Sequence, residues 1–564
     1  MVGRFLERIA GMRELVMRPV RSVHQAAYLL AGLTLASQAL ALLRDRTFAH
    51  TFGAGQVLDV YYAAFRVPDL VFALVSSLVS AYVLIPRITG MDKEATRRLL
   101  SDSISFLVIG GGALSAVLAV FMPQFLGLLF PDLARSALSA QFVFLARLLL
   151  LQPILLGLSG VLGSVTQVHR RFTLFAISPV LYNLGIIFGT VALYPRFGLF
   201  GIGAGVIIGS LAYLAVNVPV VIEAGVMPTF RWPDFRAVGS VMRDSVPRSL
   251  ALGMGSVTAL ILTAFASRIG TGSVSVFTFA SNLAAVPLSL IGSSYAVAAF
   301  PALSEKSAPE ERGAFTSILS ASARHIILWS IVAAGLVIVL RAHLVRVILG
   351  SGEFDWNATR LTAAMLAILS VSLAAQGLVL LFSRALYAVR QSWRPLLYQI
   401  IGGIFTVVIA LAFIGASGGL PQTLANYLKV GDIGGASILL IALAQTLGQV
   451  FLAVLSLAAL RSIAPGLAAT LTRSVIDGLV ASFAGGAAAY FTLTLLGGIA
   501  PLTTLLTVFL DGFTAGVVGL IAAACSLYYI ENEEFRIAAG ALKRLLKREA
   551  PGVLPPSGDE PIQP

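Results

Sequence analysis

Long apolar runs separated by short polar or charged breaks make up most of the chain. A helix that crosses a hydrocarbon layer of about 30 Å needs about 20 mostly apolar residues, and the sequence holds fourteen runs of that kind. Because lipid offers the backbone no hydrogen-bond partners, we predict that each run is a transmembrane helix and that the fold is all-α. The predicted spans are residues 25–43, 57–85, 103–123, 140–165, 173–194, 199–222, 247–267, 273–299, 316–340, 361–386, 396–416, 435–460, 474–497 and 503–529.

The composition excludes a soluble protein. Of the 564 residues, 58% are hydrophobic and only 12% are charged, and the mean hydropathy is +0.91. No soluble domain of this size hides so much apolar surface, so the pattern predicts a polytopic membrane protein. The net charge of +13 would suggest a nucleic-acid partner in a soluble protein, but in a membrane protein basic cytoplasmic loops account for it, and no nucleic acid is expected.

The distribution of basic residues predicts the orientation. With the N-terminus placed in the cytoplasm, the cytoplasmic segments hold roughly three times as many Lys and Arg residues as the opposite loops. The even number of spans then puts both termini in the cytoplasm. Residues 1–24 carry five arginines and apolar residues at helical spacing, which predicts a basic amphipathic segment on the membrane surface. Residues 531–564 are predicted to form a cytoplasmic tail that is partly disordered.

The sequence offers little for redox or metal chemistry. The single cysteine, Cys525, cannot form an intrachain disulfide, and the five histidines do not pair with acids at the spacing of metal ligands. We therefore expect no cofactor and no metal site, and we do not expect an enzyme.

An internal repeat divides the chain. Phe52–Gly55 and Ile269–Gly272 precede similar spans 217 residues apart, and Val168–Phe172 and Val389–Trp393 repeat at an offset of 221. Duplication of six spans predicts two parallel six-helix lobes followed by a C-terminal helix pair. Two matched lobes around a cleft are typical of alternating-access transporters, with the substrate between the lobes. The predicted units are residues 25–230 (spans 1–6), 231–465 (spans 7–12) and 466–530 (spans 13 and 14).

Ionisable side chains inside the predicted spans are the best candidates for a substrate site, because each costs roughly 2.5–3.5 kcal/mol at the bilayer centre unless it faces water or a partner. In span 2, Asp59, Tyr62, Arg66 and Asp69 recur at helical spacing and share one face. Arg44 ends span 1. We predict that Arg44, Asp59 and Arg66 bind substrate in a wet cavity; the alternative is a salt bridge that only holds the bundle together. The secondary candidates are Tyr62, Arg147 and Asn282.

Concentrated arginine in the first lobe favours an anionic substrate. Guanidinium groups in a cleft of low dielectric constant bind phosphate or pyrophosphate through paired charge-assisted hydrogen bonds. An exporter of cationic drugs would instead favour acids and aromatic residues. Arg44 and Arg66 therefore favour a phosphate or pyrophosphate group on the transported molecule.

Several motifs carry a resemblance to a known family. In order along the chain they are Leu43–Asp45, Phe52–Gly55, Asp59, Ala64–Leu70, Arg171–Phe172, Ser178–Asn183, Phe300–Ser304, Gly350–Asp355, Arg384–Ala388 and Pro395. Their order and spacing resemble the MurJ/MviN lipid II flippases, members of the multidrug/oligosaccharidyl-lipid/polysaccharide exporter superfamily, over about residues 25–530.

The resemblance implies a multi-pass protein of the bacterial inner membrane with fourteen helices and a cationic central cavity. The cavity would bind the undecaprenyl-pyrophosphate-linked headgroup of lipid II, a peptidoglycan precursor, and carry it to the outer leaflet; membrane lipids and cell-wall synthesis proteins would be partners. Arg44 and Asp59 match family positions regarded as functional, and Arg66 matches a usual Lys or Arg. The positions at which the chain departs from the family pattern are Gln38, Phe72, Ala73, Ser76–Val79, Ser281, Asn282 and Gln391.

These departures leave other functions open. The chain could be a flippase for a less highly charged lipid-linked oligosaccharide, or a small-molecule antiporter of the same superfamily. It could also be a transport-dead membrane scaffold for cell-envelope enzymes. A transporter should show a solvated cleft that Arg44, Asp59 and Arg66 reach, whereas a scaffold should fill that space with Leu and Phe.

Overall fold

The computed structural model describes residues 23–75, 81–415, 420–497 and 504–546, and within these ranges the regular structure is helical throughout. The predicted surface segment at residues 1–24 and the end of the predicted tail lie almost wholly outside them. The start of that tail, Glu533–Leu546, forms helix α25.

The first half of the chain, here called the N-half, comprises the helices up to residue 223. They are α2 (Val23–Phe52), α3 (Gln56–Leu74), α4 (Ala81–Ile88), α5 (Lys93–Phe106), η2 (Leu107–Gly111), α6 (Gly112–Leu129), α7 (Pro131–Ala134), α8 (Ser139–Leu149), α9 (Leu151–Val168), α10 (Phe172–Phe188), η3 (Gly189–Leu193), α11 (Tyr194–Phe197), α12 (Leu199–Ala215) and α13 (Val218–Glu223).

The next helices form the C-half, and three more follow it. The C-half holds α14 (Phe235–Ser267), α15 (Ser273–Leu288), η4 (Ser289–Ser293), α16 (Ser294–Glu305), η5 (Pro309–Glu311), α17 (Arg312–Leu349), α18 (Trp356–Ser370), α19 (Leu373–Ala388), α20 (Trp393–Gly415), α21 (Gln422–Leu428) and α22 (Ile438–Leu460). The last three are α23 (Leu467–Leu495), α24 (Leu505–Tyr529) and α25.

Helix length and hydropathy agree with a membrane protein. In the described ranges, eleven helical segments are long and apolar enough to cross a membrane. The number is twelve if the pair α18 and α19, which is bent by 47°, counts as one span. Each corresponds to a predicted span. The first two predicted spans, on α2 and α3, are not in this set, and α3 carries Asp59, Arg66 and Asp69 within 19 residues. The all-α fold is confirmed, but the count of fourteen is not.

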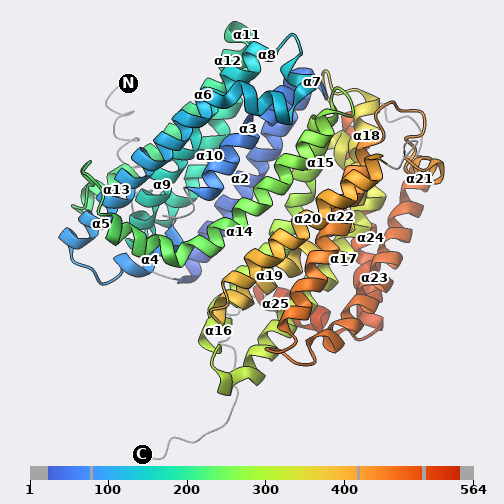
Figure 1. The fold of residues 1–564 in the computed structure, drawn as a ribbon. Coiled ribbons are helices and arrows are strands. Elements are labelled where there is room, and N and C mark those ends of the chain that lie inside the picture. The colour runs from blue at the N-terminus through green and yellow to red at the C-terminus, as the bar shows by residue number, and fades with distance from the viewer. Residues whose placement is uncertain (1–22, 76–80, 416–419, 498–503, 547–564) are drawn as a thin grey trace, which may run out of the picture.

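The N-half meets the C-half at α14 and α15, which belong to the C-half. In Figure 1 the blue to cyan helices α2–α13 gather on one side and the yellow to red helices α17–α24 on the other, with green α14 and α15 between them. Helix α14 packs against both α3 and α20, and α15 packs against both α3 and α18. The largest cluster of buried apolar side chains is continuous across this contact, from Phe48 and Tyr61 to Phe279 and Met365.

The repeat predicted from the sequence reappears in turn geometry. Arg170, between α9 and α10, and Arg390, between α19 and α20, both adopt a left-handed backbone, with φ of 56° and 59°. The amide of Arg171 donates to the carbonyl of Thr166, and the amide of Gln391 donates to that of Leu386, so the same turn closes both helix pairs. A left-handed conformation is uncommon for residues other than glycine, which makes its recurrence at equivalent positions informative. The domain boundaries at 230/231 and 465/466 remain predictions.

Candidate functional site

The two halves are joined at the end of the bundle where α2 ends and α3, α15 and α18 begin, here called the joined end. Asp59, in the first turn of α3, is 1% exposed and accepts three hydrogen bonds from the start of α15. The amide of Gly272 donates to Oδ2 at 2.6 Å, and Ser275 donates to Oδ1 from its amide at 2.8 Å and its hydroxyl at 2.6 Å. A carboxylate is the favoured partner for the unpaired amides of a helix N-terminus. Asp59 therefore clamps α3 of the N-half to α15 of the C-half.

Two further connections strengthen the joined end. Arg46 in α2 donates from Nη1 to the carbonyl oxygens of Val347 and Ile348, at 2.6 and 3.3 Å, in the last turn of α17. The amide of Glu353 donates to the carbonyl of His50 at 3.1 Å. A cation on the free carbonyls of a helix C-terminus is stabilising. Arg46 is therefore a second clamp between the halves.

Below the joined end, Arg44 and Arg66 line one cavity of about 230 Å³ between the halves, here called the central cavity. Tyr62, Asp69, Gln152 and Tyr182 line it from the N-half. Thr278 and Asn282 of α15 line it from the C-half. The cavity thus brings together, from different helices, the two arginines that the sequence predicted to act together.

The guanidinium of Arg44 is held by a network of polar side chains. Its Nε and Nη2 donate to Oδ1 of the neighbouring Asp45, at 3.0 and 2.8 Å, and its Nη1 donates to Oδ1 of Asn183 in α10 at 3.1 Å. Oδ2 of Asp45 accepts from Nδ2 of Asn282 in α15 at 2.9 Å. This network links α2 to α10 and α15, so Arg44 is oriented before any substrate binds.

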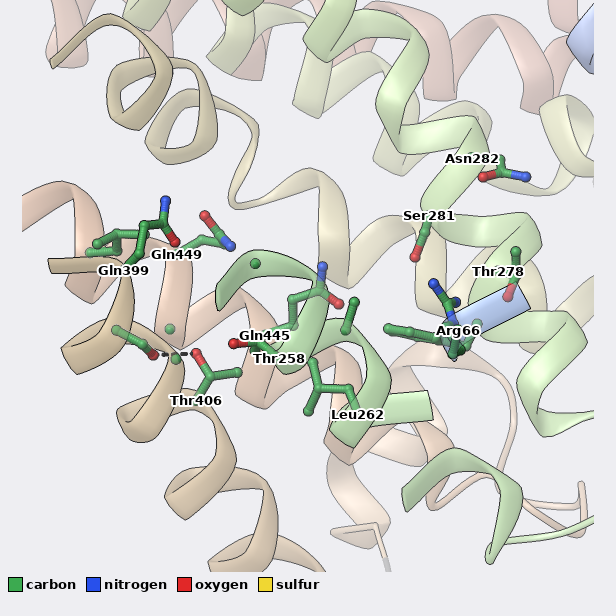
Figure 2. A pocket seen from close by; sticks show the side chains of 17 residues that line it. Arg66, Thr258, Leu262, Thr278, Ser281, Asn282, Gln399, Thr406, Gln445 and Gln449 are labelled. Carbon is green, nitrogen blue, oxygen red and sulfur yellow. Dashed lines mark hydrogen bonds between the residues drawn. The ribbon is translucent and has the colours of Figure 1, made fainter. Parts of the chain in front are cut away.

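Arg66, unlike Arg44, has a guanidinium nitrogen without a hydrogen-bond partner. Its Nε is buried and has no hydrogen-bond partner, and its side chain lines both the central cavity and a neighbouring pocket in the C-half. Figure 2 shows its guanidinium beside Ser281 and Thr278. Buried polar groups almost always have a partner, so Arg66 has free hydrogen-bonding capacity for an anion that enters the cavity.

The other predicted site residues fall into two groups. Tyr62, whose buried hydroxyl has no partner, and Asn282 both line the central cavity with Arg44 and Arg66. Asp59, which the sequence predicted in the cavity, does not line it, because its carboxylate accepts hydrogen bonds from the start of α15. Arg147 is exposed on α8 and donates from Nε to the carbonyl of Ala119 at 2.7 Å, so it also lies outside the cavity.

Several residues of the site have no role predicted from the sequence. Asp45 stood between two arginines in the sequence, which could have marked it as their counter-ion. Asn183 and Tyr182 lay inside a recognised motif but had no assigned role, and Gln152 had no local signal at all; its Nε2 donates to the Tyr182 hydroxyl at 2.9 Å. Among the residues that the structure describes, no cluster of three or more His, Cys, Asp or Glu side chains could hold a metal.

Comparison with known proteins identifies the family. A family model described as "Lipid II flippase MurJ" matches residues 48–510 of this chain. The chain belongs to the MurJ family. The "Lipid II flippase MurJ" of Burkholderia cenocepacia is 23% identical over 432 residues, which cover 74% of this chain and 80% of that protein. The "Probable lipid II flippase MurJ" of Vibrio cholerae is 25% identical over 412 residues, covering 69% and 77% of the two chains.

Solved structures agree on the fold of the MurJ family. A structure titled "Lipid II flippase MurJ, inward closed conformation" superposes with a TM-score of 0.70 at 18% identity, covering 90% of this chain and all of that one. An inward-facing multidrug resistance MATE family transporter of the MOP superfamily superposes with a TM-score of 0.61 at 15% identity, covering 77% of this chain and 96% of that one. The likeness to both supports the same two-half helical architecture.

Proposed function

We propose that this protein is a flippase that moves the pyrophosphate-linked headgroup of lipid II, or of a closely similar lipid-linked sugar, from the inner to the outer leaflet of the bacterial cytoplasmic membrane. The observation that carries the proposal is the cavity between the halves that both Arg44 and Arg66 line. Arginine binds phosphate oxygens through paired charge-assisted hydrogen bonds. Membership of the MurJ family supports the substrate class.

The orientation is part of the proposal. The distribution of Lys and Arg predicts that both termini lie in the cytoplasm, and with this orientation the joined end faces the outside. In this state the headgroup would enter the cavity from the cytoplasmic side, and Arg66, with its unpartnered Nε, would bind the pyrophosphate together with Arg44. Rocking of the halves would break the Asp59 and Arg46 clamps and open the cavity outward.

The proposed transport breaks no covalent bond, so the protein acts as a carrier and not as an enzyme. Two negative charges that move outward across an inside-negative membrane release about 2.3 kcal/mol each per 100 mV. The membrane potential is therefore a sufficient driving force for this step. A scaffold would pack apolar side chains around Arg44 and Arg66, and the cavity at that place favours transport.

Flipping measured in proteoliposomes with fluorescent lipid II tests the proposal. We expect Arg44→Ala and Arg66→Ala to slow flipping by about tenfold to a hundredfold, since a hydrogen bond to a charged group contributes about 1.5–3 kcal/mol. Arg147→Ala, a change of an exposed arginine outside the cavity, is the matched control and should flip at the wild-type rate. Wild-type rates for the Arg44 and Arg66 variants would overturn the proposal.

A second experiment tests the substrate in the cell. The gene should restore growth to a bacterium depleted of its own lipid II flippase, and the Arg66→Ala variant should not do so at equal expression. Growth supported equally by both proteins would contradict the assigned role of Arg66.

A further inference from the structure

A second pocket, here called the amide chamber, lies in the C-half next to Arg66. It has a volume of about 250 Å³ and is formed by α14, α15, α20 and α22. Its polar side chains are mostly amides and hydroxyls: Thr258, Thr278, Ser281, Asn282, Gln399, Thr406, Gln445 and Gln449. Thr278, Asn282 and Arg66 also line the central cavity, so the two spaces meet at these residues.

The amide chamber contains polar atoms that lack a partner. Oε1 of Gln445 and Oγ of Ser281 are buried and make no hydrogen bond. Leaving a buried acceptor or donor unpaired costs about 1–3 kcal/mol, so such groups are usually satisfied by a ligand or by water. In Figure 2, Gln399 and Gln449 lie on one side of the chamber, Arg66 and Ser281 on the other, and Gln445 between them.

The amide chamber also has an apolar wall, formed by Leu262, Phe277 and Leu452. Gly448 in α22 lets the Thr406 side chain of α20 pack against it, because a Cβ at this position would collide with the Thr406 hydroxyl. Amide groups together with apolar side chains in one pocket suit a sugar ring, which presents hydroxyls at its edge and C–H groups on its faces.

The charge of the amide chamber also favours a neutral sugar that is attached to a phosphate. Among the described residues that line it, Arg66 is the only charged one, and it lies at the boundary with the central cavity. Its positive charge disfavours a bound cation, and the amides beyond it offer both donors and acceptors without charge. A neutral group that is attached to an anion therefore fits best, with the anion at Arg66 and the neutral part among the glutamines.

We propose that the amide chamber binds the sugar that is linked directly to the pyrophosphate, through Gln445, Gln449 and Ser281, while Arg66 holds the adjacent phosphate. The inference rests on the proposed function, because it assumes a lipid-linked sugar pyrophosphate as the substrate. It adds that this chain recognises the sugar itself through neutral amides in the C-half, and not only the pyrophosphate through arginines in the N-half.

Binding of three lipids to the purified protein tests this inference. The probes are undecaprenyl pyrophosphate without sugar, undecaprenyl pyrophosphate that carries one N-acetylhexosamine, and lipid II with its pentapeptide. We expect the double variant Gln445→Leu/Gln449→Leu to bind both sugar-bearing lipids about tenfold more weakly and undecaprenyl pyrophosphate less than about twofold more weakly, as the loss of two hydrogen bonds predicts. Gln422→Leu, a change of an exposed glutamine in α21, is the matched control and should leave all three affinities unchanged.

The other outcomes separate failure of the sugar site from failure of the proposed function. An equal loss for all three lipids, or no loss for any, in a variant that keeps the wild-type Tm would overturn the amide chamber as a sugar site. A loss confined to lipid II would assign the chamber to the second sugar or the peptide and overturn it as the site of the sugar next to the pyrophosphate. If the wild-type protein bound none of the three lipids, the proposed function itself would fail. Arg66→Ala should weaken all three lipids together.

Discussion

Asp59 in α3 accepts two hydrogen bonds from Ser275 in α15, one from the backbone amide and one from the hydroxyl. The two residues are 216 positions apart and belong to different halves of the chain. Their contact is therefore a direct measure of whether the joined end is closed. Any transport cycle that opens this end must break it.

The first prediction concerns this contact. Asp59→Asn replaces one of the two carboxylate oxygens with an amide NH2, which cannot accept a hydrogen bond. At least one donor of α15 then faces another donor, and that hydrogen bond becomes a repulsion. Hydrogen bonds to a charged group contribute about 1.5–3 kcal/mol, so the fraction of molecules open at this end should rise about tenfold or more. Spin labels at Ser136→Cys and Arg268→Cys, in a Cys525→Ser background, should report an added population at longer distance.

A matched control exists for this experiment. Asp132→Asn removes an exposed carboxylate from the N-half near the same end and should leave the distance distribution unchanged. An Asp59→Asn distribution identical to that of the wild type would show that the clamp does not hold the end closed.

A second prediction compares two glycines with the same backbone conformation. Gly272, at the start of α15, has a φ of +85°, and Gly90, between α4 and α5, has a φ of +90°. A Cβ at Gly272 would collide with the backbone carbonyl of Ala54 in the N-half, whereas at Gly90 nothing lies within 4 Å. Both Gly→Ala variants should carry the cost of a left-handed alanine, about 1–2 kcal/mol. Gly272→Ala should lose a further ~1–3 kcal/mol because the halves must separate locally.

Thermal unfolding of the detergent-solubilised protein, followed by tryptophan fluorescence, measures the difference. The Tm of Gly272→Ala should fall below that of Gly90→Ala. Equal Tm values would mean that the contact between Gly272 and Ala54 is not tight in solution.

The third prediction is a pH dependence outside the membrane spans. Arg360, at the start of α18, donates to Asp432 from Nη1 at 2.8 Å and from Nη2 at 2.5 Å, and this hydrogen bonding lowers the pKa of the Asp432 carboxyl from its ordinary value of 3.8. Because the folded-state pKa is depressed, the pair contributes stability above the ordinary pKa and loses it as the pH falls through the lowered value. The wild type should therefore be more stable than Asp432→Asn by a constant amount from about pH 5 to 8.

Below that range the difference should vanish. The Tm gap between wild type and Asp432→Asn is expected to shrink only as the pH falls below the ordinary pKa of 3.8. A gap that changed instead near neutral pH would assign the titration to another group, and no gap at any pH would show that solvent screens this exposed pair completely.

The sequence by its local patterns shows which segments are helical and which arginines are candidates for a substrate site. Every predicted span falls mostly on helix in its described residues, because the length and hydropathy of a membrane helix are local properties of about 20 residues. Arg44 and Arg66 could likewise be found as candidates, since a charge within an apolar run stands out without knowledge of its neighbours. The two arginines do line one cavity.

The tertiary structure was needed to define what each polar side chain faces. It turned Asp59 from a cavity residue into a clamp on α15, placed Arg147 outside the cavity, and made Asp45 the partner of Arg44. It also assembled the amide chamber from four helices whose glutamines and threonines carry no signal in the sequence. The reason is that hydropathy fixes where a helix runs, but the face that each residue presents depends on packing between helices that lie hundreds of residues apart.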